Sequence, residues 1–166
     1  MESLLAPARE PELVLTLERH GPSLVGWARG ARATLLLPAD EAGWRAVSAP
    51  GARLPALLAR AVALRPAGTR RDREPRLASV AELADLLGHD PGAQSDILDH
   101  WRLEARWAAG AIAGLEAFVR PDGWWLVHPH TDGAELRPTS AAELWVHLAA
   151  LAPSGERIAS PPASAS

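Results

Sequence analysis

The sequence predicts an α+β fold of two similar halves, each an antiparallel β-meander followed by one amphipathic helix that packs on the sheet. In each half, short apolar runs alternate with turns that contain Gly or Pro, which is typical of meandering strands. The apolar period then changes from two to 3.6 residues, and a proline follows. The two helices share their spacing, which predicts a pseudo-two-fold relation between the halves. In this spacing Leu57, Leu58, Ala61, Leu64 and Pro66 correspond to Leu144, Trp145, Leu148, Leu151 and Pro153.

Four strands are expected in the first half. Leucine alternates with other side chains over 13–18, the period-two pattern of a half-buried strand. Two further apolar runs, 23–28 and 33–37, flank residues 29–32, whose glycine suits a tight hairpin turn. These three runs predict a meander. Pro and Gly residues bracket a fourth short strand at 44–47.

A helix and a linker end the first half. Leu, Ala and Val recur on one helical face over 54–64, and Pro55 is acceptable in the first turn. The segment 65–76 then contains five Arg residues, interspersed acids and no apolar pattern. We therefore expect a solvated linker there, which divides the half 1–66 from the half 77–153.

The second half begins with a helix signal. Ser79 and Glu82 have the spacing of a capping box, and Gly88 is placed to end the short helix that follows. A helical turn is expected at 95–100. Residues 101–107 alternate between apolar and charged side chains, which predicts a half-buried strand.

A hairpin, a strand and a helix are expected in the rest of this half. The runs 115–119 and 124–128 flank four turn-forming residues and predict the hairpin. A short strand at 134–137 precedes Thr139, the expected N-cap of a helix over 141–151.

Length and composition limit the organisation and the location of the protein. The chain has 166 residues, enough for one domain with a stable core, which we place at 1–153. Residues 154–166 are mostly Ser, Ala and Pro and predict a disordered tail. No apolar run approaches the ~20 residues of a membrane span, and the N-terminus lacks the features of a signal peptide. We therefore expect a cytoplasmic protein without a membrane span.

Several chemistries are excluded or disfavoured. Cys is absent, which excludes disulfides, thiolate zinc sites and Cys nucleophiles. The net charge of -3 disfavours a general nucleic-acid binder. His128 and His130 would point to one side of a strand, but no third ligand stands at a characteristic spacing. The motifs of nucleophilic hydrolases and of phosphate-binding loops are missing. We expect no metal, no cofactor and no enzymatic activity.

The sequence has seven Trp residues, one Phe and no Tyr. We expect Trp44, Trp101, Trp107 and one of the adjacent Trp124 and Trp125 to supply large core volume. Neighbouring strand residues face opposite ways, so Trp124 and Trp125 cannot both enter one single-faced core. One of them is expected to meet a second layer, a partner or solvent.

Two parts of the chain resemble the EspG-like family of ESX (type VII) secretion-associated proteins from actinobacteria. The first is LLAPAREPELVLTL at 4–17, which leads through the meander to LPALLARAVAL at 54–64. The second is GLEAFVRPDGWWLV at 114–127, with the helix start ELRPTSAAELW at 135–145. Family members are longer at the N-terminus, and the segment between the halves is short here.

This resemblance implies a cytosolic chaperone that is not an enzyme. It would hold a helical secretion substrate of the PE–PPE type, or a counterpart, in a soluble state before export. The positions that match the family's partner contacts are the hairpin residues Arg29, Gly30 and Arg32 and the exposed side of the last helix around Trp145 and His147.

Other classes of function stay open. A small-molecule-binding or enzymatic α+β domain would form a pocket from Trp124, Trp125, His128 and His130, with His100 as a further candidate. An immunity-type or structural partner within an operon is a third possibility. The sequence leaves both a monomer and a homodimer open, and it does not establish whether the two halves share one sheet.

Overall fold

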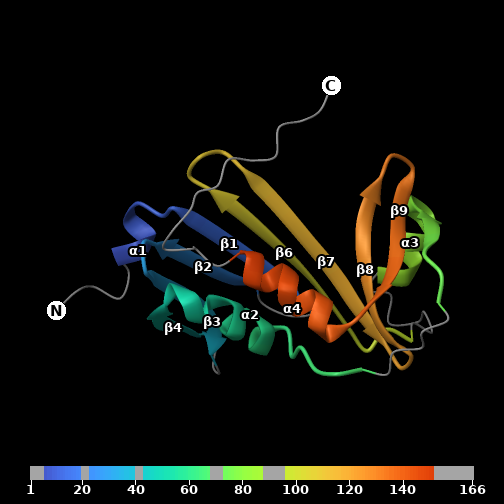
Figure 1. Ribbon diagram of the computed structural model, residues 1–166, viewed down its shortest axis with the longest axis horizontal. Helices are drawn as coiled ribbons and strands as arrows, with labels where there is room; N and C mark the ends of the chain where they lie inside the picture. Colours follow the sequence, from blue (N-terminus) through green and yellow to red (C-terminus); the bar gives the residue numbers. More distant parts are fainter. Residues whose placement is uncertain (1–5, 20–22, 40–42, 68–72, 88–95, 152–166) are drawn as a thin grey trace.

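A single antiparallel sheet organises the fold. A computed structural model of the chain describes residues 6–19, 23–39, 43–67, 73–87 and 96–151. Within these residues nine strands lie in the order β4-β3-β2-β1-β6-β7-β8-β9-β5 (Figure 1). The strands are β1 (Leu13–Arg19), β2 (Leu24–Arg29), β3 (Arg32–Ala39), β4 (Gly43–Pro50), β5 (Arg76–Ser79), β6 (Asp99–Trp107), β7 (Ile112–Arg120), β8 (Gly123–His130) and β9 (Gly133–Thr139). The helices are α1 (Ala6–Arg9), the 3₁₀ helix η1 (Gly51–Arg53), α2 (Leu54–Ala61), α3 (Val80–Leu87) and α4 (Ala141–Ala150).

Two four-stranded meanders meet at the centre of the sheet. Strands β1 to β4 follow one another toward one edge, and β6 to β9 follow one another toward the other. The two first strands, β1 and β6, pair antiparallel from Leu13 opposite Trp107 to Arg19 opposite Trp101. The halves therefore share one sheet, and the predicted α+β class with antiparallel meanders is confirmed.

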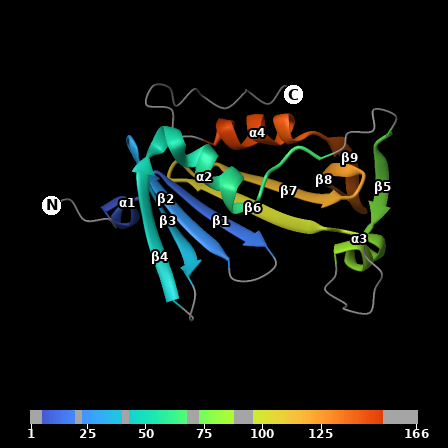
Figure 2. The ribbon, with the colours of Figure 1, turned by 90° about the horizontal axis from the view of Figure 1, so that it is seen from below.

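Helices cover both faces of the sheet, and each face has its own hydrophobic core (Figure 2). Helices α2 and α4 cover one face and enclose the main core. Helix α3 covers the other face at its β7-β8-β9-β5 end and encloses a second, smaller core. Trp124 lies in the main core and Trp125 in the second. The prediction that these two neighbours do not enter one core is confirmed, and of the three environments left open for the second one, a second layer is what Trp125 meets.

The remaining Trp predictions have mixed outcomes. Trp101 is fully buried in the main core, as expected, and Trp107 is partly buried against it. The prediction for Trp44 is wrong, because its side chain is 55% exposed. Trp44 lies in the edge strand β4 opposite Pro38, whereas the neighbouring Leu37 packs against the main core. Because side chains alternate between faces, Trp44 faces away from that core.

Helix α2 begins at Leu54, as predicted, but ends at Ala61 rather than at Leu64. Ala63 has a φ of 48°, which a right-handed helix cannot continue. Its N–H donates to the carbonyl of Arg60 at 3.1 Å, and the N–H of Leu64 donates to the carbonyl of Ala59 at 2.8 Å. These two bonds form a Schellman motif with Ala63 at the position where Gly is common.

Two boundaries in the second half differ from the predictions. The predicted helical turn over 95–100 is wrong in its described part, because residues 96–98 are not helical and Asp99 and His100 belong to β6 and pair with β7. The N-cap of α4 is Ser140 rather than Thr139. The predicted capping box of Ser79 and Glu82 is confirmed at the start of α3. Ser95, Gly88 and the predicted tail lie outside the described residues.

The predicted linker 65–76 also needs correction at its end. Arg76 begins strand β5, which pairs with β9 and forms one edge of the sheet. Arg73 is not solvated as a linker residue would be, since only 11% of its side chain is exposed. Strand β5 has only four residues, two of them apolar, and such a short segment gives too weak a periodic signal to predict a strand. Its structure is therefore decided by its pairing with β9.

Burial does not follow the predicted residue-by-residue match between the two helices. Leu58 is fully buried, but its proposed counterpart Trp145 is 42% exposed. Leu57 is only partly buried, whereas its proposed counterpart Leu144 is fully buried.

Candidate functional site

The hairpin predicted to bind a partner is exposed and is held by acids near the N-terminus. Gly30 has a φ of 54°, and its N–H donates to Glu12 Oε2 at 2.9 Å. Arg29 forms an ion pair with Glu10 at 2.9 Å and lies opposite Arg32 across the turn. The β2–β3 turn thus presents two Arg side chains in a preset conformation, with the charge of Arg29 already balanced in part.

Helix α4 is apolar on its outer face as well as on its inner face. Leu144 and Leu148 are fully buried against the sheet. Five exposed apolar residues recur at helical spacing on the remaining surface, and we call them the α4 outer face: Ala142, Trp145, Val146, Ala149 and Ala150. His147 is exposed beside them. Surface helices of globular proteins usually carry polar residues there, so this helix has the pattern of one that packs on two sides.

The only acidic side chain of α4 is turned to the start of the helix. The Ser140 hydroxyl accepts from the Glu143 N–H at 3.1 Å, and Glu143 Oε2 accepts from the Ser140 N–H at 2.9 Å. The Thr139 hydroxyl also donates to Glu143 Oε2 at 2.9 Å. These hydrogen bonds lower the pKa of the Glu143 carboxyl, and the bond from the Thr139 hydroxyl has the largest effect, ahead of the bond from the Ser140 backbone. Glu143 therefore fixes the helix start and leaves the α4 outer face without a carboxylate.

Helix α2 lies beside α4 in the same layer and runs in the opposite direction. Trp124 Nε1 donates to the carbonyl of Arg65, just after α2, at 2.9 Å. Trp124 also pairs with Thr139, just before α4. The end of α2 and the start of α4 are therefore near each other.

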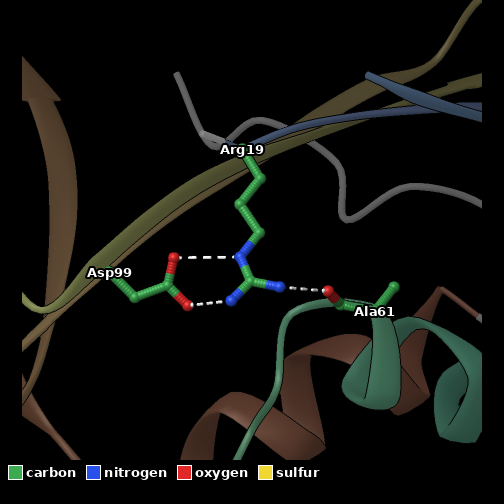
Figure 3. Close-up of polar contacts among 3 residues, drawn as sticks. All are labelled: Arg19, Ala61 and Asp99. Carbon is green, nitrogen blue, oxygen red and sulfur yellow. Dashed lines mark hydrogen bonds and ion pairs between the residues drawn. The ribbon is translucent and has the colours of Figure 1, made fainter. Parts of the chain in front are cut away.

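An Arg side chain fixes the end of α2 to the centre of the sheet (Figure 3). Arg19, the last residue of β1, donates to both oxygens of Asp99 in β6 and, through Nη1, to the carbonyl of Ala61 at 2.9 Å. A cation at a helix C-terminus is also favoured by the helix dipole. The layer of α2 and α4 is thus attached to both meanders.

The residues of the alternative pocket do not converge. Trp124 is in the main core, whereas Trp125 is in the second core, where it stacks on Phe118 with ring centroids 6.2 Å apart. His128 is partly buried and His130 is exposed, and the alternation along β8 places both on the Trp124 side of the sheet. The structure thus brings the two His residues to one side but separates the two Trp residues.

No metal site is evident in the part of the chain that the structure describes. Within it there is no group of three or more His, Asp or Glu residues that could hold a metal ion. Trp125 instead contacts a cation of the chain itself, since the Arg73 guanidinium lies 5.4 Å from its ring centroid. Arg73 also forms an ion pair with Asp122 at 3.2 Å.

Sequence reasoning missed most of the α4 outer face. It identified Trp145 and His147, both of which are exposed, but not the other members of this face, which are Ala142, Val146, Ala149 and Ala150. The signal was present, because apolar residues at 142, 145, 146 and 149 repeat the three- and four-residue spacing of a second helical stripe.

Comparisons with protein-family models and with curated proteins give no relative for this chain. No protein-family model matches it, and no curated protein matches it. Among the described residues, no helix is long and apolar enough to cross a membrane.

Proposed function

We propose that the protein is a non-enzymatic binding module, a chaperone or adaptor that covers an apolar surface of a helical protein partner. The α4 outer face carries this proposal. A contiguous exposed apolar surface marks an interaction site more often than isolated apolar residues do. Trp145 at its side is the residue type that most often dominates binding energy at protein interfaces. An adaptor of this kind needs no catalytic group.

The local structure supports binding without rearrangement. The capping box fixes the start of α4, and Arg19 holds the end of the neighbouring α2. A surface that is already ordered loses less conformational entropy when a partner binds. The α4 outer face would thus already have, in the free protein, the conformation that binds the partner.

The resemblance to EspG-like proteins adds a biological context to this proposal. On that basis the protein acts in the cytoplasm in type VII secretion, and its partner is a helical secretion substrate of the PE–PPE type or a counterpart. The pseudo-two-fold relation of the halves belongs to the same proposal. It is supported by the pairing of β1 with β6 and by the outward order of the strands on either side of that pair.

Affinity purification from the source cells tests the proposal. The tagged wild type is compared with Ala149→Arg on the α4 outer face and with Ala84→Arg on α3, a matched control because both alanines are exposed on helices. We expect a stoichiometric helical protein to co-purify with the wild type and with Ala84→Arg but not with Ala149→Arg. Equal recovery with both variants, or recovery of the protein with only a small molecule, would contradict the proposal.

A further inference from the structure

The exposed side of α2 and of the end of η1, which leads into it, is basic. Arg53 and Arg60 are seven residues apart, about two helical turns, and both are exposed on the side opposite the buried Leu54 and Leu58. No acidic residue occurs from 51 to 67. This surface therefore has a positive charge that nothing on its own element balances.

These two Arg side chains have no ionic partner among the described residues. Other Arg residues are neutralised locally, for example Arg19 by Asp99 and Arg137 by Glu135. Arg53 and Arg60 form no such pair in the described part of the chain. Their charges are thus available to a partner.

The helix that carries Arg60 lies beside the helix that carries the α4 outer face. The two helices pack against each other in one layer on the same side of the sheet (Figures 1 and 2). The β2–β3 hairpin, predicted to bind a partner, lies at one end of this basic surface, because the Gly51 N–H donates to the Ala31 carbonyl at 2.7 Å and so fixes η1 beside the turn. Glu143, the acid of α4, is engaged in the helix cap.

The geometry points to a partner helix with an apolar stripe that is bordered by Asp or Glu residues, and to Arg53 and Arg60 as the groups that bind those acids. This inference rests on the proposed function and names the chemistry of its partner. The small side chains of Ala142, Ala149 and Ala150 allow a third helix to approach closely, at the 8–10 Å typical of packed helices. Charges at the border of an apolar contact contribute to specificity and to the rate of association.

A display library of helical peptides about five turns long tests the inference. Each peptide has a fixed Leu and Ala stripe, and its flanking positions vary among Glu, Gln and Lys. The full-length protein is used as bait in four forms: wild type, Arg53→Glu with Arg60→Glu, Arg76→Glu and Ala149→Arg. Arg76→Glu is the control for reversal of an exposed Arg elsewhere, because Arg76 lies opposite Leu136 of the second core, on the α3 side of the sheet.

We expect the wild type and Arg76→Glu to enrich peptides with Glu at the flanks. Reversal of both Arg53 and Arg60 should lower the affinity for an acidic peptide about tenfold and shift enrichment toward Lys. Added salt should weaken the binding of the wild type to the acidic peptide.

The other outcomes separate failure of this inference from failure of the proposed function. In one of them, the wild type enriches apolar helices without a preference for Glu, while Ala149→Arg enriches none. That result would reject the acidic partner and leave the proposed function standing. No enrichment of any helical peptide would reject both. Binding of the wild type to vesicles of phosphatidylglycerol and phosphatidylcholine without peptide binding would also overturn the inference and would assign the basic surface to anionic lipid.

Discussion

Arg19 and Asp99 form a two-bonded ion pair that joins the two halves of the sheet. Arg19 Nε donates to Asp99 Oδ1 at 2.9 Å, and Nη2 donates to Oδ2 at 2.7 Å (Figure 3). Two parallel bonds between a guanidinium and a carboxylate fix orientation as well as distance. The third bond from this guanidinium, to Ala61, makes the pair a point where β1, β6 and α2 are held together.

Asp99→Ala should lower the free energy of unfolding by about 1–2 kcal/mol. The expected loss is smaller than for breaking a fully buried ion pair, because 37% of the Arg19 side chain is exposed and solvent screens its charge. Urea unfolding measures the change. Arg137→Ala, which removes an exposed pair on one strand, should cost less than about 0.5 kcal/mol. Equal losses in the two variants would show that the central pair has no special structural role.

Ala63→Gly should stabilise the protein by about 1 kcal/mol, because Gly adopts the positive φ at this position without the steric penalty that Ala has. Ala56→Gly, at an exposed position inside α2, should destabilise by about the same amount. Thermal and chemical unfolding of both variants check the opposite signs. A loss of stability in Ala63→Gly would refute the role of Ala63 as a strained helix end.

Three of the Trp residues expected in the core, Trp44, Trp101 and Trp107, should differ in their contribution to stability. Trp101→Ala should cost about 3–5 kcal/mol, because it removes a fully buried side chain from the main core. Trp44→Ala should cost less than about 0.5 kcal/mol, because the side chain is mainly exposed. Trp107→Ala should lie between these values. Denaturant unfolding ranks the three, and a large loss in Trp44→Ala would be incompatible with its exposure.

Stability should depend on pH through the cap of α4. The pKa of Glu143 is lower in the folded chain than its usual value of 4.5, so the ionised cap stabilises the fold above that value. The contribution is lost as the pH falls through the lower, folded pKa. The difference in unfolding free energy between the wild type and Glu143→Gln should therefore shrink between about pH 5 and pH 3. A difference that stays constant over this range would contradict the prediction.

Replacing Arg29 and Arg32 by Glu should weaken partner binding while the melting temperature stays almost unchanged. Both residues are exposed, and Arg29 loses only its exposed pair with Glu10. Isothermal titration with the co-purified partner measures affinity, and differential scanning calorimetry measures stability. Retained affinity would remove the β2–β3 turn from the interface.

Much of the sheet is predictable because its signals are local. The alternation over 13–18 and 101–107 identifies β1 and β6, and the turn residues between 119 and 124 identify the hairpin of β7 and β8. The opposite burial of Trp124 and Trp125 follows from the pleat alone. Helix 54–64 was predicted too long because Ala63 is not a Gly and gives no sign of its positive φ.

Features that depend on distant pairing are not predictable in this way. Strand β5 forms because it pairs with β9, far along the chain. Helices α2 and α4 lie side by side because β1 pairs with β6, which are far apart in the sequence. The sequence alone therefore could not show that Arg53 and Arg60 lie in the same layer as Trp145. The apolar stripe of α4 itself is local and was available in the spacing of its residues.

The central pairing of β1 with β6 has a consequence for the order of assembly. Within each meander consecutive strands are separated by at most four residues, whereas Arg19 and Asp99 are 80 residues apart in the chain. Contacts between distant segments form late, because a large loop must close first. Each meander is therefore expected to fold early and the junction between them to close last. Asp99→Ala should then accelerate unfolding and leave the rate of folding nearly unchanged, which stopped-flow chevron plots measure.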